Sequence, residues 1–502
     1  MSIADPLTLL KMELQHTAVP QILDLLSASA QDGRPLHEVE SGLWDLLLLV
    51  GHQALAAFLK QHGSGDLGER LTLPDGRDVQ RLEELHTRRY VSIFGVFELA
   101  RTVYGSREGQ ALEFVPLDNR LQLPPGDYSY LLQDWDQALA MEQPFGQVSQ
   151  TMARMLKLRQ SVDSLEEMNR QLSRTVGWFR DLQGSPPAAE EGKIVVVTAD
   201  CKGVVIRGQG TPTVCGGQRP GGQRANQKRM ATVGAVYTVD PYVRTPEEIV
   251  AALFRDPDYE AAPRPEPCHK RIWASLPVEG AHPKSSIEVV FDWLWWEFAQ
   301  RNPRLQRPTV CLCDGQDALW QACAAAIGYE DRVDILDLLH VTPRLWSAAK
   351  LLYGDKGKEV VPWVRQAVLQ VLEGRVETVI RTMRRLGKQR GLRGAKKQSL
   401  ARLCSYLHNN RQRMRYDEYL QAGYPIASGV IEGACRHLIK DRMERAGMHW
   451  TLAGAQAMLD VRSVWIGNQW DAFQKVRIDR DLERLYPHRQ LVAGEVYFAH
   501  AA

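Results

Sequence analysis

Cysteine is scarce in this chain, and the sequence lacks both a secretion signal and a long apolar segment. Only eight cysteines occur among 502 residues, and none belongs to a CxxC pair. This scarcity disfavours a zinc site and a disulfide framework. The first residues, MSIADPLTLLKMELQ, do not place a basic start before an apolar stretch, as a signal peptide does. The longest apolar runs, such as Leu46 to Val50, fall far short of the roughly 20 residues that span a bilayer. We therefore expect a cytoplasmic protein without membrane contact.

A large excess of either charge is also missing. The chain has 62 basic and 60 acidic side chains, and 44% of its residues are hydrophobic. Glycine and proline do not dominate, so the composition excludes a collagen, a coiled coil and a disordered tail protein. At about 150 residues per domain, the length predicts about three globular domains.

The near-neutral total hides two basic blocks. Residues 375–415 contain thirteen Lys or Arg and a single acid, Glu377, and residues 207–229 contain no acid. One such block is most often a solvated surface. Two of them on either side of a cluster of carboxylates favour binding to nucleic acid.

The first 182 residues are expected to be mainly helical. Leu43–Leu59 has apolar residues at helical spacing, whereas Tyr90–Tyr104 is rich in β-branched and aromatic residues and predicts one or two strands. Two short amphipathic helices, Phe145–Leu156 and Val162–Thr175, are separated by a tight turn in which Ser161 and Ser164 are candidate N-caps. This is the outline of a helix-turn-helix, in which residues 164–174 would read DNA, although plain helix packing gives the same pattern.

A change of character follows residues 183–192, QGSPPAAEEG, which we interpret as a linker. Beyond it, strands alternate with helices, as in an α/β fold. The predicted strands are residues 193–199, 230–239, 308–313 and 333–338. The predicted helices are residues 287–301, 316–327, a long basic stretch over 343–421, and an amphipathic helix over 428–445. Cys311 and Cys313 alternate along one strand and are expected to be small buried hydrophobic residues.

Two acids directly follow predicted strands. Asp200 comes after IVVVTA and Asp314 after TVCLC, and Glu432 on the last amphipathic helix would complete a cluster. Because ligands collect at the carboxyl ends of strands, these carboxylates are candidate ligands of two magnesium or manganese ions. Taken alone, each aspartate is more often a turn or capping residue. Asp317 and Asp337 are reserve ligands, and Asp240 before Pro241 is expected to be a turn residue.

The segments around the three acids resemble a known family. VVVTADCKG, CLCDGQDALW and SGVIEGACRHLIKDRM are similar to the catalytic motifs of DDE transposases of bacterial insertion sequences, in particular the ISKra group. Asp337-Leu338-Leu339-His340 resembles the D-x-x-H element of such families, and Gly447-Met448-His449-Trp450 also matches. One departure is Tyr104 to Glu108, which stands where relatives often carry a cysteine pair, so no zinc is expected there.

The resemblance implies a ribonuclease-H-like mixed sheet flanked by helices, with an all-helical insertion and a mainly helical N-terminal region. It implies that Asp200, Asp314 and Glu432 hold Mg²⁺ for the nicking of double-stranded DNA at terminal inverted repeats and the joining of the 3′-hydroxyl to target DNA. A homodimer or larger assembly on DNA, in the bacterial cytoplasm and at the nucleoid, is implied as well. The expected domains are an N-terminal region (1–125), a helix-turn-helix domain (126–182), a catalytic domain (193–342 with 423–475), the insertion (343–422) and a C-terminal tail (476–502).

Several cationic residues are candidate DNA contacts. His340 has three readings, as a buried histidine, a contact to phosphate or a flipped base, or a metal ligand. Arg436 and Lys440 share a helix face with Glu432 and suit phosphate contact, whereas Trp450 is expected to pack in the core rather than on a base. The remaining candidates are Arg207, Arg219, Arg224, Lys228, Arg384, Arg385, Lys388, Arg390, Lys396, Lys397 and Arg442.

Two other functions stay open at this point. A transposase-derived protein that has lost cleavage would bind DNA ends without nicking them. Another ribonuclease-H-like nuclease would hydrolyse DNA or RNA without strand transfer. The three intact acids favour the enzyme over the binding protein.

Overall fold

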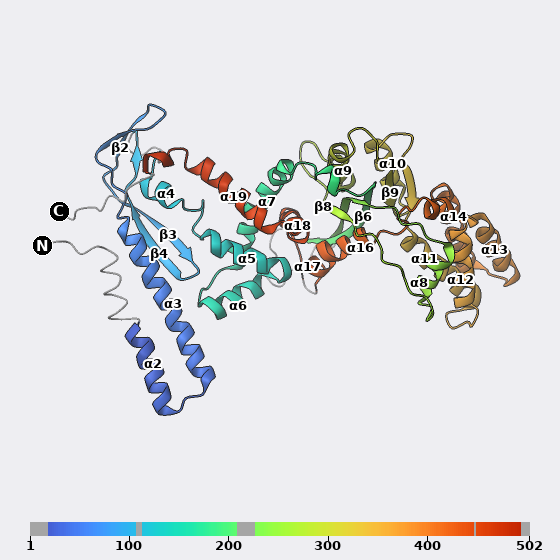
Figure 1. Ribbon diagram of the computed structural model, residues 1–502, viewed down its shortest axis with the longest axis horizontal. Helices are drawn as coiled ribbons and strands as arrows, with labels where there is room; N and C mark the ends of the chain where they lie inside the picture. Colours follow the sequence, from blue (N-terminus) through green and yellow to red (C-terminus); the bar gives the residue numbers. More distant parts are fainter. Residues whose placement is uncertain (1–18, 107–112, 208–225, 446–447, 493–502) are drawn as a thin grey trace, which may run out of the picture. The chain divides into compact units, whose positions relative to one another are not determined.

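A computed structural model describes residues 19–106, 113–207, 226–445 and 448–492 (Figure 1). The chain forms two compact units. The first contains residues 1–171 and 471–502, and the second contains residues 172–470. The first division falls within α7 (Val162–Leu182), rather than in the linker that the sequence suggested, and the second falls after Trp470, the first residue of α19 (Trp470–Leu485).

The first unit begins with a helical hairpin, α2 (Val19–Asp32) and α3 (Leu36–Gln61). Next come a two-stranded sheet of β3 (His86–Ser92) and β4 (Gly95–Arg101), as the sequence predicted, and a three-stranded sheet that it did not. That second sheet has the order β1-β2-β5 and consists of β1 (Arg70–Thr72), β2 (Asp78–Arg81) and β5 (Tyr104–Gly105).

Helices complete this unit. They are α4 (Pro116–Leu121), α5 (Tyr130–Glu142), α6 (Phe145–Leu156), α7, α19 (Trp470–Leu485) and η5 (Arg489–Val492). Helix α6 has the bounds predicted for the first helix of the helix-turn-helix, and α7 begins as predicted but runs on to Leu182. The Ser161 hydroxyl accepts a hydrogen bond from the Ser164 N–H at 3.0 Å, which confirms the predicted cap.

The described C-terminal residues, as far as Val492, are part of the first unit and do not form a separate tail. Helix α19 belongs to the first unit, where Arg477 donates a hydrogen bond to the Gln133 side chain at 2.7 Å. Val492 packs into the small core around Leu73 and Tyr104. The expectation of a tail over 476–502 was therefore wrong for the residues up to 492.

The second unit is built on a mixed five-stranded sheet of order β10-β9-β6-β7-β8. Its strands are β6 (Ile194–Arg207), β7 (Asn226–Val239), β8 (Cys268–Ser275), β9 (Thr309–Cys313) and β10 (Val333–Leu336). Strand β7 is antiparallel to both of its neighbours, β6 and β8, while β9 and β10 run parallel to β6. The α/β class predicted from the sequence is confirmed, although the edge strand β8 was not predicted.

Helices cover the sheet. They are α8 (Pro246–Phe254), α9 (Ser286–Arg301), α10 (Asp317–Ala326), α16 (Gly429–Ala434), η4 (Cys435–Lys440), α17 (Asp441–Met443) and α18 (Leu452–Ile466). Helix α9 packs on β7, where Gly234 leaves room for Val290 and Leu294. The predicted single helix over 428–445 is interrupted, because η4 is a π-helical segment between α16 and α17.

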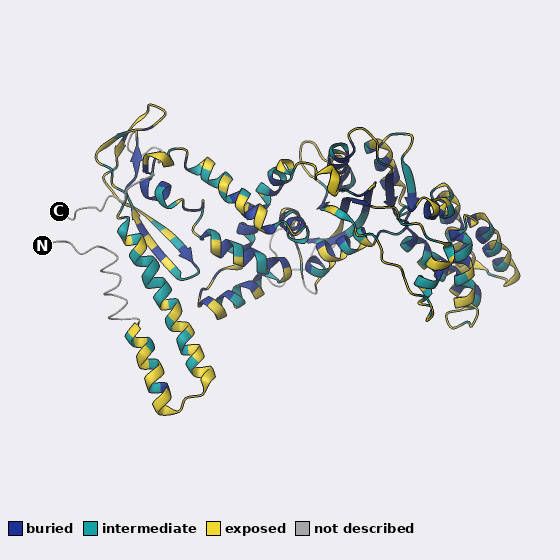
Figure 2. Cartoon of the chain, in the orientation of Figure 1, coloured by how far each residue is buried: buried dark blue, intermediate teal, exposed yellow. Residues whose placement is uncertain are grey.

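The predicted helical insertion is present but shares the core of the sheet. It comprises α11 (Leu338–Tyr353), α12 (Val360–Leu372), α13 (Val376–Gln389), α14 (Gly394–Asn409), η3 (Arg411–Arg413) and α15 (Tyr416–Gln421). Helix α11 crosses the predicted boundary between residues 342 and 343, with Pro343 inside it. One cluster of buried side chains runs from the strands through these helices to Ile426. Figure 2 shows this buried interior in dark blue.

Candidate metal centre

Asp200 and Asp314 lie beside one another because each follows one member of a pair of register partners. Ala199 on β6 pairs with Cys313 on β9, and each aspartate is the next residue along the chain. Strand β9 ends at Cys313, whereas β6 continues to Arg207. The prediction that Asp200 ends its strand was therefore wrong, yet the two side chains still meet because it is the neighbouring strand that stops.

Local hydrogen bonds hold both carboxylates. The Cys201 N–H donates to Asp200 Oδ1 at 2.7 Å, and the Gln316 N–H donates to Asp314 Oδ1 at 2.8 Å. The loop after Asp314 lies close against α14, since a Cβ on Gly315 would come within 2.3 Å of the Tyr406 ring. These contacts fix the direction of the carboxylates without neutralising them.

His340 comes to the same place from the first turn of α11. Asp337 caps this helix, because its Oδ1 accepts a hydrogen bond from the Leu339 N–H at 2.8 Å. Its other oxygen lies 3.6 Å from Nδ1 of His340. Strand β10 ends at Leu336, so Asp337 is a buried capping residue that orients the imidazole.

The ligand atoms of Asp200, Asp314 and His340 all lie within 4.8 Å of one another. Among the residues that the structure describes, no other group of three or more acids, histidines or cysteines has its ligand atoms within this distance. All three side chains are half-buried, so the cluster is accessible from solvent.

The electrostatics of the cluster fit a bound cation. Burial raises the pKa of Asp314, and the charge of Asp200 raises it further, while the Gln316 N–H opposes both. The contact with Asp337 raises the pKa of His340, burial opposes this, and the two other carboxylates add to the rise. Negative charge is therefore concentrated here beyond what the neighbouring N–H groups relieve.

Glu432 lies near this cluster but outside it. It is an exposed residue of α16 and is not among the three side chains whose ligand atoms meet. Burial of its carboxyl raises its pKa, as do Asp337 and Asp200, whereas His340 lowers it. The structure thus brings together two of the three predicted catalytic acids, with His340 in the third position.

Of the two reserve ligands, Asp337 lies beside His340 and Asp317 lies away from the cluster. Asp317 is an exposed residue in the first turn of α10. Asp240 is exposed and accepts a hydrogen bond from the Lys193 N–H at 3.2 Å, as expected of a turn residue. One contact was not predicted: the Cys435 thiol donates to Asp200 Oδ2 at 3.5 Å. Cys435 stands three residues after Glu432, and that helical spacing was the signal available in the sequence.

The candidate DNA contacts divide into exposed and buried residues. Arg442 is only 1% exposed, with its guanidinium 5.1 Å from the centre of the Trp450 ring, so its prediction as a DNA contact was wrong. Trp450 is itself buried, which confirms its reading as a core residue. Arg219 and Arg224 lie outside the described residues. Arg207, Lys228, Arg436 and Lys440 are exposed, as are Arg384, Arg385, Lys388, Arg390, Lys396 and Lys397 on and around α13 and α14.

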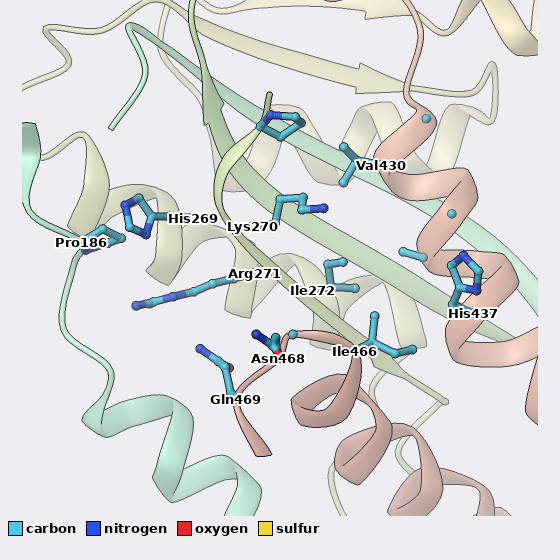
Figure 3. A pocket seen from close by; sticks show the side chains of 15 residues that line it. Pro186, His269, Lys270, Arg271, Ile272, Val430, His437, Ile466, Asn468 and Gln469 are labelled. Atoms are coloured by element: carbon cyan, nitrogen blue, oxygen red, sulfur yellow. The ribbon is translucent and has the colours of Figure 1, made fainter. Parts of the chain in front are cut away.

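A separate hollow of about 600 Å³ lies on the other side of the helix that carries Glu432 (Figure 3). Its walls are the edge strand β8, with His269 and Lys270, and a helix face formed by Val430, Gly433 and His437. Neither the acids of the cluster nor Glu432 line it. The hollow is therefore distinct from the candidate metal centre.

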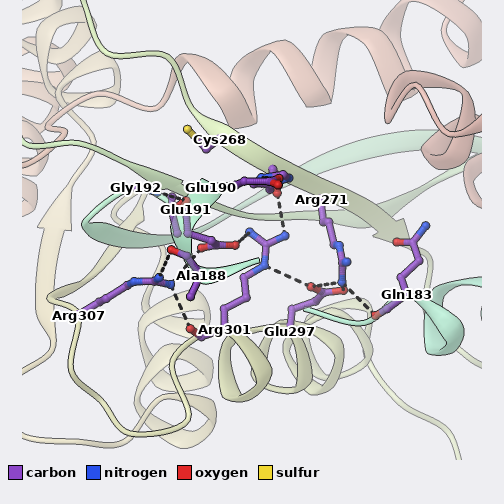
Figure 4. Close-up of polar contacts among 12 residues, drawn as sticks. Gln183, Ala188, Glu190, Glu191, Gly192, Cys268, Arg271, Glu297, Arg301 and Arg307 are labelled. Atoms are coloured by element: carbon purple, nitrogen blue, oxygen red, sulfur yellow. Dashed lines mark hydrogen bonds and ion pairs between the residues drawn. The ribbon is translucent and has the colours of Figure 1, made fainter. Parts of the chain in front are cut away.

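The segment expected to be a linker is anchored beside this hollow. The side chain of Glu191 is 1% exposed and lies 3.8 Å from Arg301 and 3.2 Å from Arg307 (Figure 4). Glu297 continues the network to Arg301 at 3.7 Å and to Arg271 at 2.9 Å. Residues 188–190 form the short helix η2 (Ala188–Glu190). The linker interpretation was wrong for this part, because a buried ion network fastens it to α9 and β8.

No model of a known protein family matches the chain, and no curated protein matches its sequence.

Proposed function

We propose that this chain is a DNA transposase of the DDE type, which cuts and joins phosphodiester bonds with a divalent metal ion. The observation that carries the proposal is the placement of Asp200 and Asp314 directly after the register pair Ala199 and Cys313, with His340 beside them. Hydrolysis would leave a 3′-hydroxyl and a 5′-phosphate at the end of the element. That hydroxyl would then displace a target phosphodiester, so that one bond forms for each bond broken.

The donor set suits a hard or borderline divalent cation. Two carboxylates and one imidazole lie close enough to share one ion. The pKa of Asp314 is raised mainly by burial and in smaller part by the charge of Asp200, which a bound cation would offset. A bound ion would supply an activated water and charge stabilisation at the phosphate. Because imidazole suits Mn²⁺ better than Mg²⁺, we expect Mn²⁺ to bind more tightly. The second ion expected from the sequence would need Glu432 as an additional donor.

The order of the strands supports a ribonuclease-H-like catalytic domain. Numbered along the chain, the five strands lie in the order 5-4-1-2-3, with the first three antiparallel and the last two parallel to the first. This places the first and fourth strands side by side. Asp200 on the first strand and Asp314 after the fourth strand therefore lie close together. The resemblance to DDE transposases implies the same placement of two catalytic acids.

Exposed cations supply a surface for DNA. One side of α13 is buried through Val379, Ile380 and Met383, and its other side presents Arg384 and Arg385 to solvent. Phosphate contacts of this kind are non-specific and depend on salt. Helices α6 and α7 would read the terminal inverted repeats. Assembly of two ends requires at least two copies of the chain, in the bacterial cytoplasm and at the nucleoid.

The test is a cleavage assay on labelled double-stranded DNA that carries the sequences flanking the gene. We expect wild-type protein to nick it with Mg²⁺ or Mn²⁺, and Asp200→Asn and Asp314→Asn to bind the same DNA without nicking. Asp317→Asn is the matched control, because Asp317 is exposed and three residues from Asp314. Hydrolysis without joining would favour a different nuclease.

The exclusion of Glu432 from the cluster favours one alternative, a DNA-binding protein that has lost cleavage. Such a protein would bind the same DNA but would leave it intact with either metal. The proposed enzyme would then be contradicted, even if DNA binding were tight.

A further inference from the structure

The helical hairpin α2–α3 exposes a large apolar surface that no contact among the described residues covers. None of the 26 residues of α3 is buried, although the helix is rich in leucine. Seven large apolar side chains of the hairpin are between 42% and 80% exposed. One is Trp44, whose indole is hydrogen-bonded to α6, and the other six are Val19, Leu23, Leu26, Leu36, Leu47 and Phe58. Figure 2 shows exposed residues along α2 and the first half of α3, whereas the second half of α3 is mostly of intermediate exposure. Contiguous apolar surface of this kind marks an interaction site.

These side chains form two straight stripes. On α2, Val19, Leu23 and Leu26 follow the spacing of one helix face. On α3, Leu36, Leu47 and Phe58 are each eleven residues apart, which is close to three full turns. The seam between the helices is elsewhere, where Gly42 packs against Leu25. At about 100° of rotation per residue, measured from Leu25 on α2 and from Gly42 on α3, both stripes lie on the same side of the hairpin.

Other sides of α3 already have partners within the first unit. Leu55, Ala56 and Leu59 pack on the core around Phe97 of β4. Nearer its start, the Trp44 indole donates a hydrogen bond to the Met155 carbonyl of α6 at 2.7 Å. The striped side is the part of the helix that these contacts leave exposed.

We propose that the striped side of the hairpin is the interface with a second copy of this chain, in a two-fold symmetric four-helix arrangement. A two-fold interface uses the same surface on both copies, so an apolar stripe covers its own counterpart. At about 100 Å² from each of six large side chains, two copies would bury roughly 1,200 Å², the lower limit of a stable interface. The inference rests on the hairpin alone and holds for a chain without any nuclease activity.

A bilayer fits this surface less well. Helix α3 is long and apolar enough to cross a membrane by length and composition, which the sequence analysis did not anticipate. However, Asp45 lies within it and is 3.4 Å from Lys157, and its last turns pack on a β-sheet. A spanning helix would have to give up both contacts and bury a charge in lipid.

The mass of the full chain in solution tests the proposal without DNA or metal. We expect light scattering after gel filtration to give twice the chain mass for the wild type, and the mass of one chain for Leu23→Glu combined with Leu47→Glu. Both positions are exposed, so the charges should not disturb the fold, and far-UV circular dichroism checks this. The matched control is Leu253→Glu with Val361→Glu, two exposed apolar residues of the second unit, which should stay dimeric.

Three results would overturn the proposal. A wild-type chain of single mass would show that the hairpin has no second copy to pair with. A double variant that remains dimeric would place the interface elsewhere. Flotation of the wild type, but not of the double variant, with vesicles of phosphatidylcholine and phosphatidylglycerol would assign the stripes to a membrane.

Discussion

Ala199 and Cys313 are register partners on neighbouring parallel strands, and this pairing places Asp200 beside Asp314. The relationship depends on a difference in strand length, because β9 stops at Cys313 while β6 continues. The pairing of β6 with β9 stops at Ala199 and Cys313, directly before the two aspartates. His340 reaches the same place from α11.

Removal of His340 is expected to weaken metal binding more than removal of the charge on Glu432. His340→Ala takes away a donor within 4.8 Å of both aspartates, so Mn²⁺ affinity should fall at least tenfold, or about 1.4 kcal/mol. Glu432→Gln should change that affinity less than threefold but abolish DNA cleavage. Titration calorimetry with Mn²⁺ measures the first effect and the nicking assay the second. The opposite order of affinities would return Glu432 to the primary ligand set.

A methyl group on Gly315 should disturb the metal centre indirectly. Gly315→Ala would bring a Cβ within 2.3 Å of the Tyr406 ring, which is held under the guanidinium of Arg344 at 3.7 Å. The loop should move and break the hydrogen bond from Gln316 to Asp314, so we expect about a tenfold loss of Mn²⁺ affinity.

Tyr406→Ala in the same chain should restore most of that affinity, because it removes the clash. Gly433→Ala is the control, since a Cβ there meets no atom within 4 Å. Equal losses for the two glycine variants, or no rescue by the second substitution, would contradict this account.

The parts of the second unit that were predictable are those with strong local patterns. Residues 194–199 and 309–313 are fully buried runs that are apolar except for Thr198 and Thr309, and α9 begins with a capping box at Ser285. Strand β8 has no such pattern, since its sequence CHKRIWAS opens with polar residues at the edge of the sheet. Edge strands carry little of the hydrophobic alternation on which such predictions rest.

The composition of the candidate metal centre was only partly predictable for a different reason. The two aspartates follow recognisable strands, but the distance of Glu432 from them depends on how its helix packs. A π-helical segment begins at Cys435, three residues after Glu432, and helix propensities do not anticipate such a segment. His340 was a candidate from its spacing to Asp337, and only the cap formed by Asp337 fixes its direction.

The buried ion network predicts a large difference between two adjacent glutamates. Glu191→Ala would leave the fully buried guanidinium of Arg301 with one carboxylate, Glu297, and the His269 carbonyl, which should cost about 3–5 kcal/mol of unfolding free energy. Glu190→Ala removes a side chain that is 61% exposed and pairs only with His269, so a change below about 1 kcal/mol is expected. Urea denaturation of both variants measures the difference. Similar, small effects would restore the interpretation of this segment as a free linker.

Asp136 should make the first unit less stable as the pH rises from about 4 to 7. Its side chain is fully buried on α5 and accepts a hydrogen bond from Gln160 at 2.6 Å, and burial raises its pKa to about 7. Because the unfolded carboxyl titrates near 3.9, the folded state holds more protons between these values, and stability falls by up to about 1.4 kcal/mol per pH unit. Above pH 7 this contribution becomes constant.

Asp136→Asn should remove this dependence, because the amide resembles the protonated acid at every pH. The variant should match the wild type near pH 4 and exceed it in thermal stability at pH 8, as measured by calorimetry across that range. Asp127→Asn provides the control, since Asp127 is half-exposed and its pair with Arg89 at 3.5 Å contributes at most about 1 kcal/mol. A variant that loses stability between pH 4 and pH 7 in parallel with the wild type would show that a group other than Asp136 carries the dependence.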